Sequence, residues 1–330
     1  MRVRHNNGKR DCMQDILMRD DGAPWLKKKS IARLKSGGFY VLSTANCILG
    51  DAMEPLQKEI ERLFRMGEKA AKDPKARALF VQFRDALTQG KIRAAEKTSA
   101  GWQVNVWVKL GILLGFRIGK LQSSGSARGL SFVDKNTFPP RQWRTRDQVR
   151  IVPGGSAVRA GAYVAPSVVC MPPMYINVGA YVEEGTMIDS HALVGSCAQI
   201  GKRVHLSAAA QIGGVLEPVS MAPVIIENDV LVGGNCGVYE GTIVQSRAVL
   251  GAGTILTRST PLYDLVREKI YRAGADQSLI VPENAVVVPG SRAVSGAKAG
   301  EWKLSLYTPV IVKYRDASTD SRIELEEWLR

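Results

Sequence analysis

The apolar residues between Val152 and Leu256 recur with a period of six. An aliphatic residue or a cysteine occupies every sixth position through eleven successive hexads, and the series resumes for six more after one interruption. Small or β-branched residues stand at most positions four places further along. The two runs are Val152, Val158, Val164, Cys170, Ile176, Val182, Ile188, Val194, Ile200, Leu206 and Ile212, then Ile226, Val232, Val238, Val244, Leu250 and Leu256.

A period of six fits neither an isolated amphipathic helix nor a single alternating strand. It is typical of a solenoid, in which each short repeat stacks on the next and buries a shared interior column. The pattern therefore predicts a mainly β protein built as a triangular prism of short parallel strands, a parallel β-helix. At three hexads per coil, the two runs correspond to about five to six coils.

The interruption between the two runs predicts a projecting loop. Fourteen residues separate Ile212 from Ile226, where two hexads would need twelve. The surplus must leave the prism, and loops on a rigid scaffold are frequent sites of ligand binding.

The residues before the prism show helical patterns. An amphipathic helix is predicted from residue 51 to a break at Pro74, a second helix over 75–88, a strand over 102–108 and a buried helix over 109–118. The apolar face of the first helix consists of Met53, Leu56, Ile60, Leu63 and Phe64.

Four regions follow from these patterns. Residues 1–50 form an extension of unknown structure, and 51–148 form a mainly helical N-terminal domain. The prism occupies 149–262, and strands with a terminal helix over 322–329 are expected in the C-terminal region 263–330.

The chain is strongly basic, with a net charge of +14 and a pI near 9.7. The positive charge is dispersed along the sequence and no nucleic-acid-binding motif accompanies it, so a small polyanionic ligand is favoured over a nucleic acid. No apolar run is long enough to span a membrane, and no signal peptide is evident at the N-terminus. A cytoplasmic protein without membrane association is expected.

Metal and disulfide chemistry are disfavoured. The five cysteines are widely spread without a CxxC pair. A prism that binds zinc through three histidines would have to use His5, His191 and His205, and His5 lies outside the organised part of the chain. Cys197 falls at an outward position of the prism, where the pattern leaves a functional thiol open.

Several segments of the prism resemble one family closely. The chain is similar to the tetrahydrodipicolinate N-succinyltransferases, hexapeptide-repeat acyltransferases of lysine and diaminopimelate synthesis, over about residues 55–330. The segments that carry the resemblance are 150–153 (RIVP), 177–189 (NVGAYVEEGTMID), 194–202 (VGSCAQIGK), 205–207 (HLS) and 212–218 (IGGVLEP).

The resemblance implies a left-handed parallel β-helix with a helical N-terminal domain. It also implies a homotrimer with active sites in the grooves between neighbouring prisms. The implied substrate is a cyclic dicarboxylate that opens to expose an amine, and this amine attacks the thioester carbonyl of succinyl-CoA or acetyl-CoA. No metal is implied.

The resemblance also implies roles for individual residues. Arg150 matches a substrate contact, and its planar guanidinium suits a carboxylate. Asp189 matches the active-site aspartate, with both a catalytic and a substrate-binding role, and it follows the inward Ile188 so that it points outward. Contacts to coenzyme A are expected from Ser207, Gly213, Gly214, Ala252 and Arg258.

Departures from the family pattern keep alternatives open. Gly237 stands where the family has an active-site glutamate, and His191 stands where it has a tryptophan. His191 is a candidate to replace the lost base. One alternative is a paralogue that uses acetyl-CoA in secondary metabolism, of the tabtoxin-biosynthesis type. The other is a catalytically impaired prism retained as a binding or assembly subunit.

Overall fold

The computed structural model of the chain describes residues 31–33, 39–41, 45–125, 131–275 and 277–316. The chain divides into two compact units, Met1–Glu54 and Pro55–Arg330. In the first unit, β1 (Ile31–Arg33) and β2 (Phe39–Val41) pair in antiparallel fashion. The functional residues considered below all belong to the second unit. The predicted helix over 322–329 lies outside the described residues.

Helices and two small hairpins precede the prism. The helices are α1 (Ala45–Arg65), α2 (Ala76–Thr88) and α3 (Val106–Ile118), with 3-10 turns η1 (Gly67–Lys72) and η2 (Thr145–Asp147). The hairpins are β3 (Ala95–Thr98) with β4 (Gly101–Val104), and β5 (Leu121–Gly125) with β6 (Ser131–Lys135).

The predicted strand over 102–108 was wrong beyond Val104, because the following residues belong to α3, which packs closely against α2. The strand ends at Val104, and α3 begins at Val106 instead of residue 109. Gly111 and Gly115 of α3 face the rings of Phe83 and Phe80, and an added Cβ would lie within 2.4 Å of either ring. By starting at Val106, the helix buries both Val108 and Ile112.

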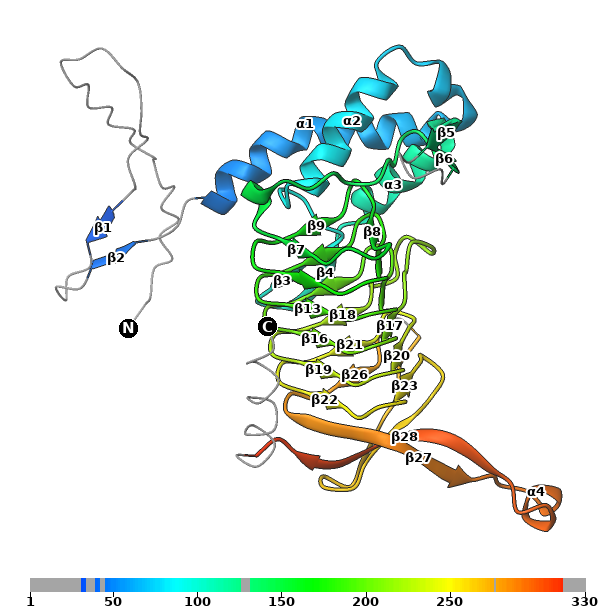
Figure 1. Cartoon of the computed structure of the whole chain (residues 1–330). Helices are drawn as coiled ribbons and strands as arrows, with labels where there is room; N and C mark the ends of the chain where they lie inside the picture. Colours follow the sequence, from blue (N-terminus) through cyan, green and yellow to red (C-terminus); the bar gives the residue numbers. More distant parts are fainter. Residues whose placement is uncertain (1–30, 34–38, 42–44, 126–130, 276, 317–330) are drawn as a thin grey trace, which may run out of the picture. The chain divides into compact units, whose positions relative to one another are not determined.

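The hexad segment forms a left-handed parallel β-helix with three faces (Figure 1). Every strand has two residues, of which the second points inward. The first face contains β7 (Arg150–Ile151), β10 (Val169–Cys170), β13 (Met187–Ile188), β16 (His205–Leu206), β19 (Leu231–Val232) and β22 (Val249–Leu250). The second contains β8 (Ala157–Val158), β11 (Tyr175–Ile176), β14 (Leu193–Val194), β17 (Gln211–Ile212), β20 (Gly237–Val238) and β23 (Ile255–Leu256). The third contains β9 (Tyr163–Val164), β12 (Tyr181–Val182), β15 (Gln199–Ile200), β18 (Ile225–Ile226), β21 (Ile243–Val244) and β26 (Ile280–Val281).

The first position of the hexad series was misplaced by one residue. Ile151, and not Val152, pairs with Cys170 in the inward column and packs against the core. The turn to β8 contains one residue more than a hexad provides. Gly154 and Gly155 accommodate it with positive φ values of 149° and 95°.

The stacking extends beyond residue 262, where the hexad pattern faded. Val281 joins the column of Val244, and Val287 joins that of Leu250, after an excursion that leaves the prism at Leu256. The C-terminal elements are β24 (Leu262–Asp264), β25 (Lys269–Tyr271), β27 (Ala285–Ala293), α4 (Ala297–Glu301) and β28 (Ser305–Tyr314). They continue the first face as a ten-stranded sheet.

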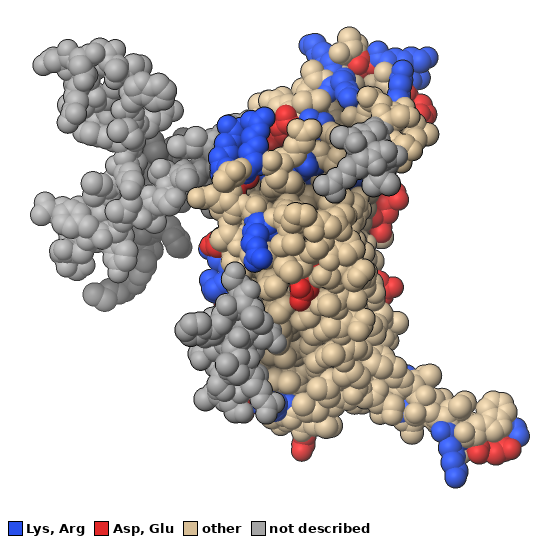
Figure 2. All heavy atoms as spheres, viewed as in Figure 1, with Lys and Arg blue, Asp and Glu red and all other residues tan. Residues whose placement is uncertain are grey.

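Charged residues are unevenly placed on the visible side of the molecule. Figure 2 shows Lys and Arg concentrated over the helical end, with few charged atoms on the side of the prism that faces the viewer. No helix within the described ranges is long and apolar enough to cross a lipid bilayer.

Candidate active site

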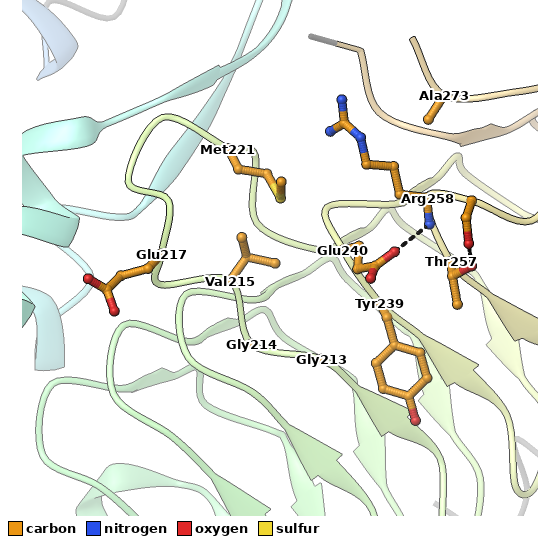
Figure 3. A pocket seen from close by; sticks show the side chains of 11 residues that line it. Gly213, Gly214, Val215, Glu217, Met221, Tyr239, Glu240, Thr257, Arg258 and Ala273 are labelled. Carbon is orange, nitrogen blue, oxygen red and sulfur yellow. Dashed lines mark hydrogen bonds between the residues drawn. The ribbon is translucent and has the colours of Figure 1, made fainter. Parts of the chain in front are cut away.

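A pocket of about 860 Å³ lies at the corner between the second and third faces (Figure 3). Two excursions from the prism build its walls: the loop 213–224, between β17 and β18, and the segment 257–279, between β23 and β26. The plain turn that follows β20 lies between them. The lining residues are Gly213, Gly214, Val215, Glu217, Met221, Tyr239, Glu240, Thr257, Arg258, Ser259 and Ala273.

A buried lysine holds the first of these walls. Lys109 of α3 is fully buried and its Nζ donates to the backbone carbonyl of Met221 at 2.5 Å. Burial lowers the pKa of Lys109, while the neighbouring Cys197 acts in the opposite direction. The helical domain thereby fixes the loop that forms one side of the pocket.

Arg258 holds the opposite wall. Its backbone N–H donates to Oε2 of Glu240 at 2.8 Å, the dashed line in Figure 3. Its Nη2 donates to the carbonyl oxygens of Gly274, at 2.6 Å, and of Ala275. Part of this guanidinium is therefore engaged in positioning the segment that contains Ala273.

Arg150 and Asp189 lie on the first face, away from this pocket. Arg150 pairs with Val169, which pairs in turn with Met187, so Arg150 lies two rungs from the strand that Asp189 follows. At the usual strand spacing this is about 10 Å. The guanidinium of Arg150 is exposed and makes no hydrogen bond or ion pair with the described residues.

Asp189 has a neighbour that the sequence analysis missed. Nε2 of His205 lies 3.4 Å from Oδ2 of Asp189, and the two side chains are 11% and 28% exposed. His205 is eighteen residues beyond Met187, its strand partner, which is one complete coil. Counting three hexads from Met187 finds His205 as its strand partner, and Asp189 is two residues beyond Met187.

The residues predicted to contact coenzyme A divide between two corners of the prism. Gly213, Gly214 and Arg258 line the pocket. Ser207 and Ala252 do not line it, because they follow β16 and β22 of the first face, at the same corner as Asp189. One chain therefore presents two separate sets of candidate residues.

The two departures at His191 and Gly237 have different surroundings. His191 is exposed in a left-handed turn with φ 64°, and its side chain makes no hydrogen bond with the described residues. Gly237 is buried beneath the ring of Tyr239. The space that a side chain at position 237 would occupy is thus filled by the ring of Tyr239, which the sequence analysis did not consider.

Cys197 lies outside the interior column of the prism, as predicted, but it is not accessible. This cysteine is fully buried, and burial raises the pKa of its thiol to about 12. Helix α3 covers this corner of the prism, where Ile112 packs over the neighbouring Gly179 and Lys109 approaches Cys197. A thiol in this setting is a packing residue. Among the described residues, no three His, Cys, Asp or Glu side chains are grouped closely enough to hold a metal ion.

Two models of known protein families match segments of the chain. A family model described as the hexapeptide repeat of succinyl-transferase matches residues 223–258, and the prism is that of a hexapeptide-repeat acyltransferase, an enzyme that takes its acyl group from coenzyme A. A second model, described as the tetrahydrodipicolinate N-succinyltransferase N-terminal region, matches residues 55–118.

Curated relatives are matched over most or nearly all of their own length. The 2,3,4,5-tetrahydropyridine-2,6-dicarboxylate N-succinyltransferases of Sodalis glossinidius and Dechloromonas aromatica are 40% and 39% identical over 287 and 285 residues. Each alignment covers 84% of this chain and 99% or 98% of the relative. The enzyme of the same name from Nitrobacter hamburgensis is 43% identical over 252 residues, 74% of this chain and 87% of its own. The chain belongs to this family.

Proposed function

We propose that the chain transfers the succinyl group of succinyl-CoA to the amine of ring-opened tetrahydrodipicolinate, or of a close relative, in the pathway to diaminopimelate and lysine. The observation that carries this proposal is the match, over 84% of this chain and nearly the whole length of the relatives, to proteins that bear this activity in their names. The two family models place parts of the helical domain, 55–118, and of the prism, 223–258, in the same family.

The first face supplies groups suited to the acceptor. The guanidinium of Arg150, which has no partner among the described residues, can form two parallel hydrogen bonds to one carboxylate of a dicarboxylic substrate. The half-buried carboxylate of Asp189 can orient the attacking amine and accept its proton.

The pocket at the other corner suits the acyl donor. The glycine backbone at 213–214 leaves room for a narrow chain such as pantetheine to approach the prism closely, and the lining is partly apolar. The free nitrogens of Arg258 face the same pocket and can meet a phosphate (Figure 3).

The separation of these two sets supports an active site shared between copies, as in the homotrimer that the family resemblance implies. Within one prism, the pocket and Asp189 lie at different corners, so a neighbouring copy must bring its first face to the pocket for the two substrates to meet. A prism side with few charges, as in Figure 2, is compatible with close packing against another copy.

The reaction needs no external oxidant or metal. The amine nitrogen attacks the thioester carbonyl carbon, the C–N bond forms, and an oxyanion develops on the carbonyl oxygen. Asp189 accepts the proton of the amine, the C–S bond breaks, and the thiolate leaves and is protonated. The products are an amide and free coenzyme A.

Thiol release tests the proposal directly. Purified protein is incubated with tetrahydrodipicolinate and either succinyl-CoA or acetyl-CoA, and free thiol is followed with and without the acceptor. Acceptor-dependent release from succinyl-CoA is the expected result. Release from acetyl-CoA alone identifies the acetyl-transferring paralogue, and no release from either donor by a folded trimer identifies a binding or assembly subunit.

A further inference from the structure

Tyr239 occupies a slot that two glycines create on the outer surface of the second face. An ideal Cβ on Gly237 would lie 2.4 Å from Cε2 of Tyr239, and one on Gly213 would lie 2.7 Å from Cδ1 of the same ring. Gly213 and Tyr239 are neighbours in successive rungs, since the N–H of Gly213 donates to the carbonyl of Val238. The ring therefore lies flat against backbone in a place where any side chain at 213 or 237 would collide with it.

The slot fixes the position of the Tyr239 hydroxyl. The oxygen lies 2.8 Å from the place of a Cβ on Gly237, so it occupies the volume into which a side chain at 237 would project. The ring forms one margin of the pocket, and its hydroxyl points away from Met221 and Arg258 along the outer surface of the prism (Figure 3).

The hydroxyl of Tyr239 makes no hydrogen bond with any described residue, and Tyr239 is only partly exposed. The hydroxyl of Thr257, one rung further on, is engaged with Ser259 and Thr260 at 3.2 and 2.7 Å. Glu217 and Glu240 line the same pocket, but ionised carboxylates can only accept hydrogen bonds.

We infer that the Tyr239 hydroxyl donates a hydrogen bond to the thioester carbonyl oxygen of the acyl donor and stabilises the oxyanion formed during transfer. This inference rests on the proposed function. The acceptor amine must come from outside this prism, so the reacting carbonyl has to lie where the pocket opens onto the outer surface, and the hydroxyl lies at that margin. A phenol is a neutral donor there, and its proton stays on its own oxygen throughout the transfer.

The matched pair Tyr239→Phe and Tyr175→Phe tests this role. Both remove one phenol hydroxyl from the outer side of the second face and keep the ring, and Tyr175 does not line the pocket. Tyr239→Phe is expected to lower kcat with succinyl-CoA about a hundredfold, with less than a threefold change in the KM for succinyl-CoA. Tyr175→Phe should stay within threefold of the unmodified protein in both constants.

A second readout does not depend on turnover. Succinyl-CoA labelled with ¹³C at the thioester carbonyl is bound to the protein, and the carbonyl stretch is measured by infrared difference spectroscopy. A hydrogen bond from Tyr239 lowers this frequency, and the shift should disappear in Tyr239→Phe and persist in Tyr175→Phe.

The outcomes separate the two proposals. An unchanged carbonyl frequency in Tyr239→Phe, or a kcat within threefold, overturns the role of Tyr239 and leaves the proposed function standing. A frequency shift that depends on Tyr239, without turnover of tetrahydrodipicolinate by the unmodified protein, supports the role and overturns the acceptor. Failure to bind succinyl-CoA at all overturns both.

Discussion

Asp189 is a carboxylate held at the surface of the prism by the residues before and after it. Its backbone N–H donates to the carbonyl of Leu206 at 2.9 Å, which fixes the chain, and the imidazole of His205 limits the side chain on one side. A carboxylate in this position remains accessible to an acceptor from solvent while its orientation is restricted.

Asp189→Asn should remove the proton acceptor with little change in shape. We expect turnover to fall by at least about a hundredfold, the usual contribution of a general base. The melting temperature should not change, because no described residue pairs with Asp189 apart from His205 at 3.4 Å. Steady-state thiol release and circular dichroism measure the two effects.

The control for this variant is Asp229→Asn. Asp229 is also a partly exposed carboxylate at a prism turn, where it pairs with Arg203 at 2.6 Å. Its substitution should leave turnover intact. Equal turnover by Asp189→Asn and the unmodified chain would exclude a chemical role for Asp189.

Some of these residue positions follow from the sequence and others do not. The outward direction of Asp189 follows from the inward direction of Ile188, because side chains alternate along a strand. The attachment of Arg258 to the carbonyls of 274–275 does not, because the excursion between Leu256 and Ile280 has no hexad register. The slot of Tyr239 depends on two glycines twenty-four residues apart, and only the stacked structure brings them together.

At the scale of elements, the hairpin of β3 and β4 is attached to the third face through one buried carboxylate. Glu227, whose side chain is 8% exposed, accepts hydrogen bonds from Lys97 Nζ at 2.7 Å and Trp102 Nε1 at 2.8 Å. The backbone N–H and the hydroxyl of Ser246 also donate hydrogen bonds to Glu227. Burial alone would raise the pKa of Glu227, but these donors outweigh it and the pKa is lowered below 4.5.

This attachment should make the stability of the protein sensitive to acid. A carboxylate with a lowered pKa contributes stability that is fully present above its ordinary pKa of 4.5 and is lost as the pH falls through the lower, folded-state value. Glu227→Gln should lower the free energy of unfolding at pH 7 by about 1–2 kcal/mol, a value kept modest because Lys97 is largely exposed.

Urea unfolding between pH 3.5 and 7 measures both effects. The difference between Glu227→Gln and the unmodified protein should shrink as the pH falls below 4.5. A difference that stays constant over this range would show that the charge of Glu227 plays no part in holding the hairpin.

The floor of the pocket depends on a glycine one rung before it. A Cβ on Gly195 would lie 2.2 Å from the backbone nitrogen of Gly214 and 2.6 Å from the carbonyl carbon of Gly213. Gly195→Ala must therefore displace backbone, and we expect a loss of about 1–3 kcal/mol in the free energy of unfolding. The KM for the acyl donor should rise, because the displaced segment lines the pocket.

Gly300→Ala is the matched control for this substitution. An added Cβ at Gly300 meets nothing within 4 Å, and the residue lies in α4. This change should be neutral or slightly stabilising, since alanine favours a helix over glycine. If both variants had the same stability, the close contact at Gly195 would not matter.

The hexad pattern predicted the elements of the prism better than their limits. It predicted the parallel strands and their inward residues because every rung repeats the same burial. It misplaced the first inward residue, because a two-glycine turn can absorb an extra residue without leaving a sign in the apolar series.

At the scale of the whole molecule, the proposed active site combines the pocket of one copy with Asp189 of another. This arrangement predicts complementation between two inactive variants. Asp189→Asn lacks the base, and Ala273→Trp fills the pocket from its lining without altering the first face. In trimers reassembled from equal amounts of both, about a quarter of the interfaces combine an intact pocket with an intact Asp189.

Thiol release by the mixed trimers measures this prediction. We expect roughly a quarter of the unmodified activity after co-refolding, and none from either variant alone. Light scattering establishes that three copies are present. Mixed trimers without activity would place the donor and acceptor sites in a single copy.

The arrangement of subunits is the part of the site that the sequence predicts least. The hexads specify one prism, and the resemblance to the family supplied the grooves between prisms as an expectation. The structure adds that the predicted coenzyme contacts occupy two corners, which the spacing of Ser207, Gly213 and Arg258 along the chain does not reveal.

Both walls of the pocket leave the prism at the same corner and rejoin it in register. The loop 213–224 returns to β18 and the segment 257–279 returns to β26, each at the position where the buried column continues. Either wall can therefore gain or lose residues in the course of evolution while the core that stabilises the protein stays the same. We therefore expect a change in the length or sequence of either segment to alter the pocket at little cost to folding.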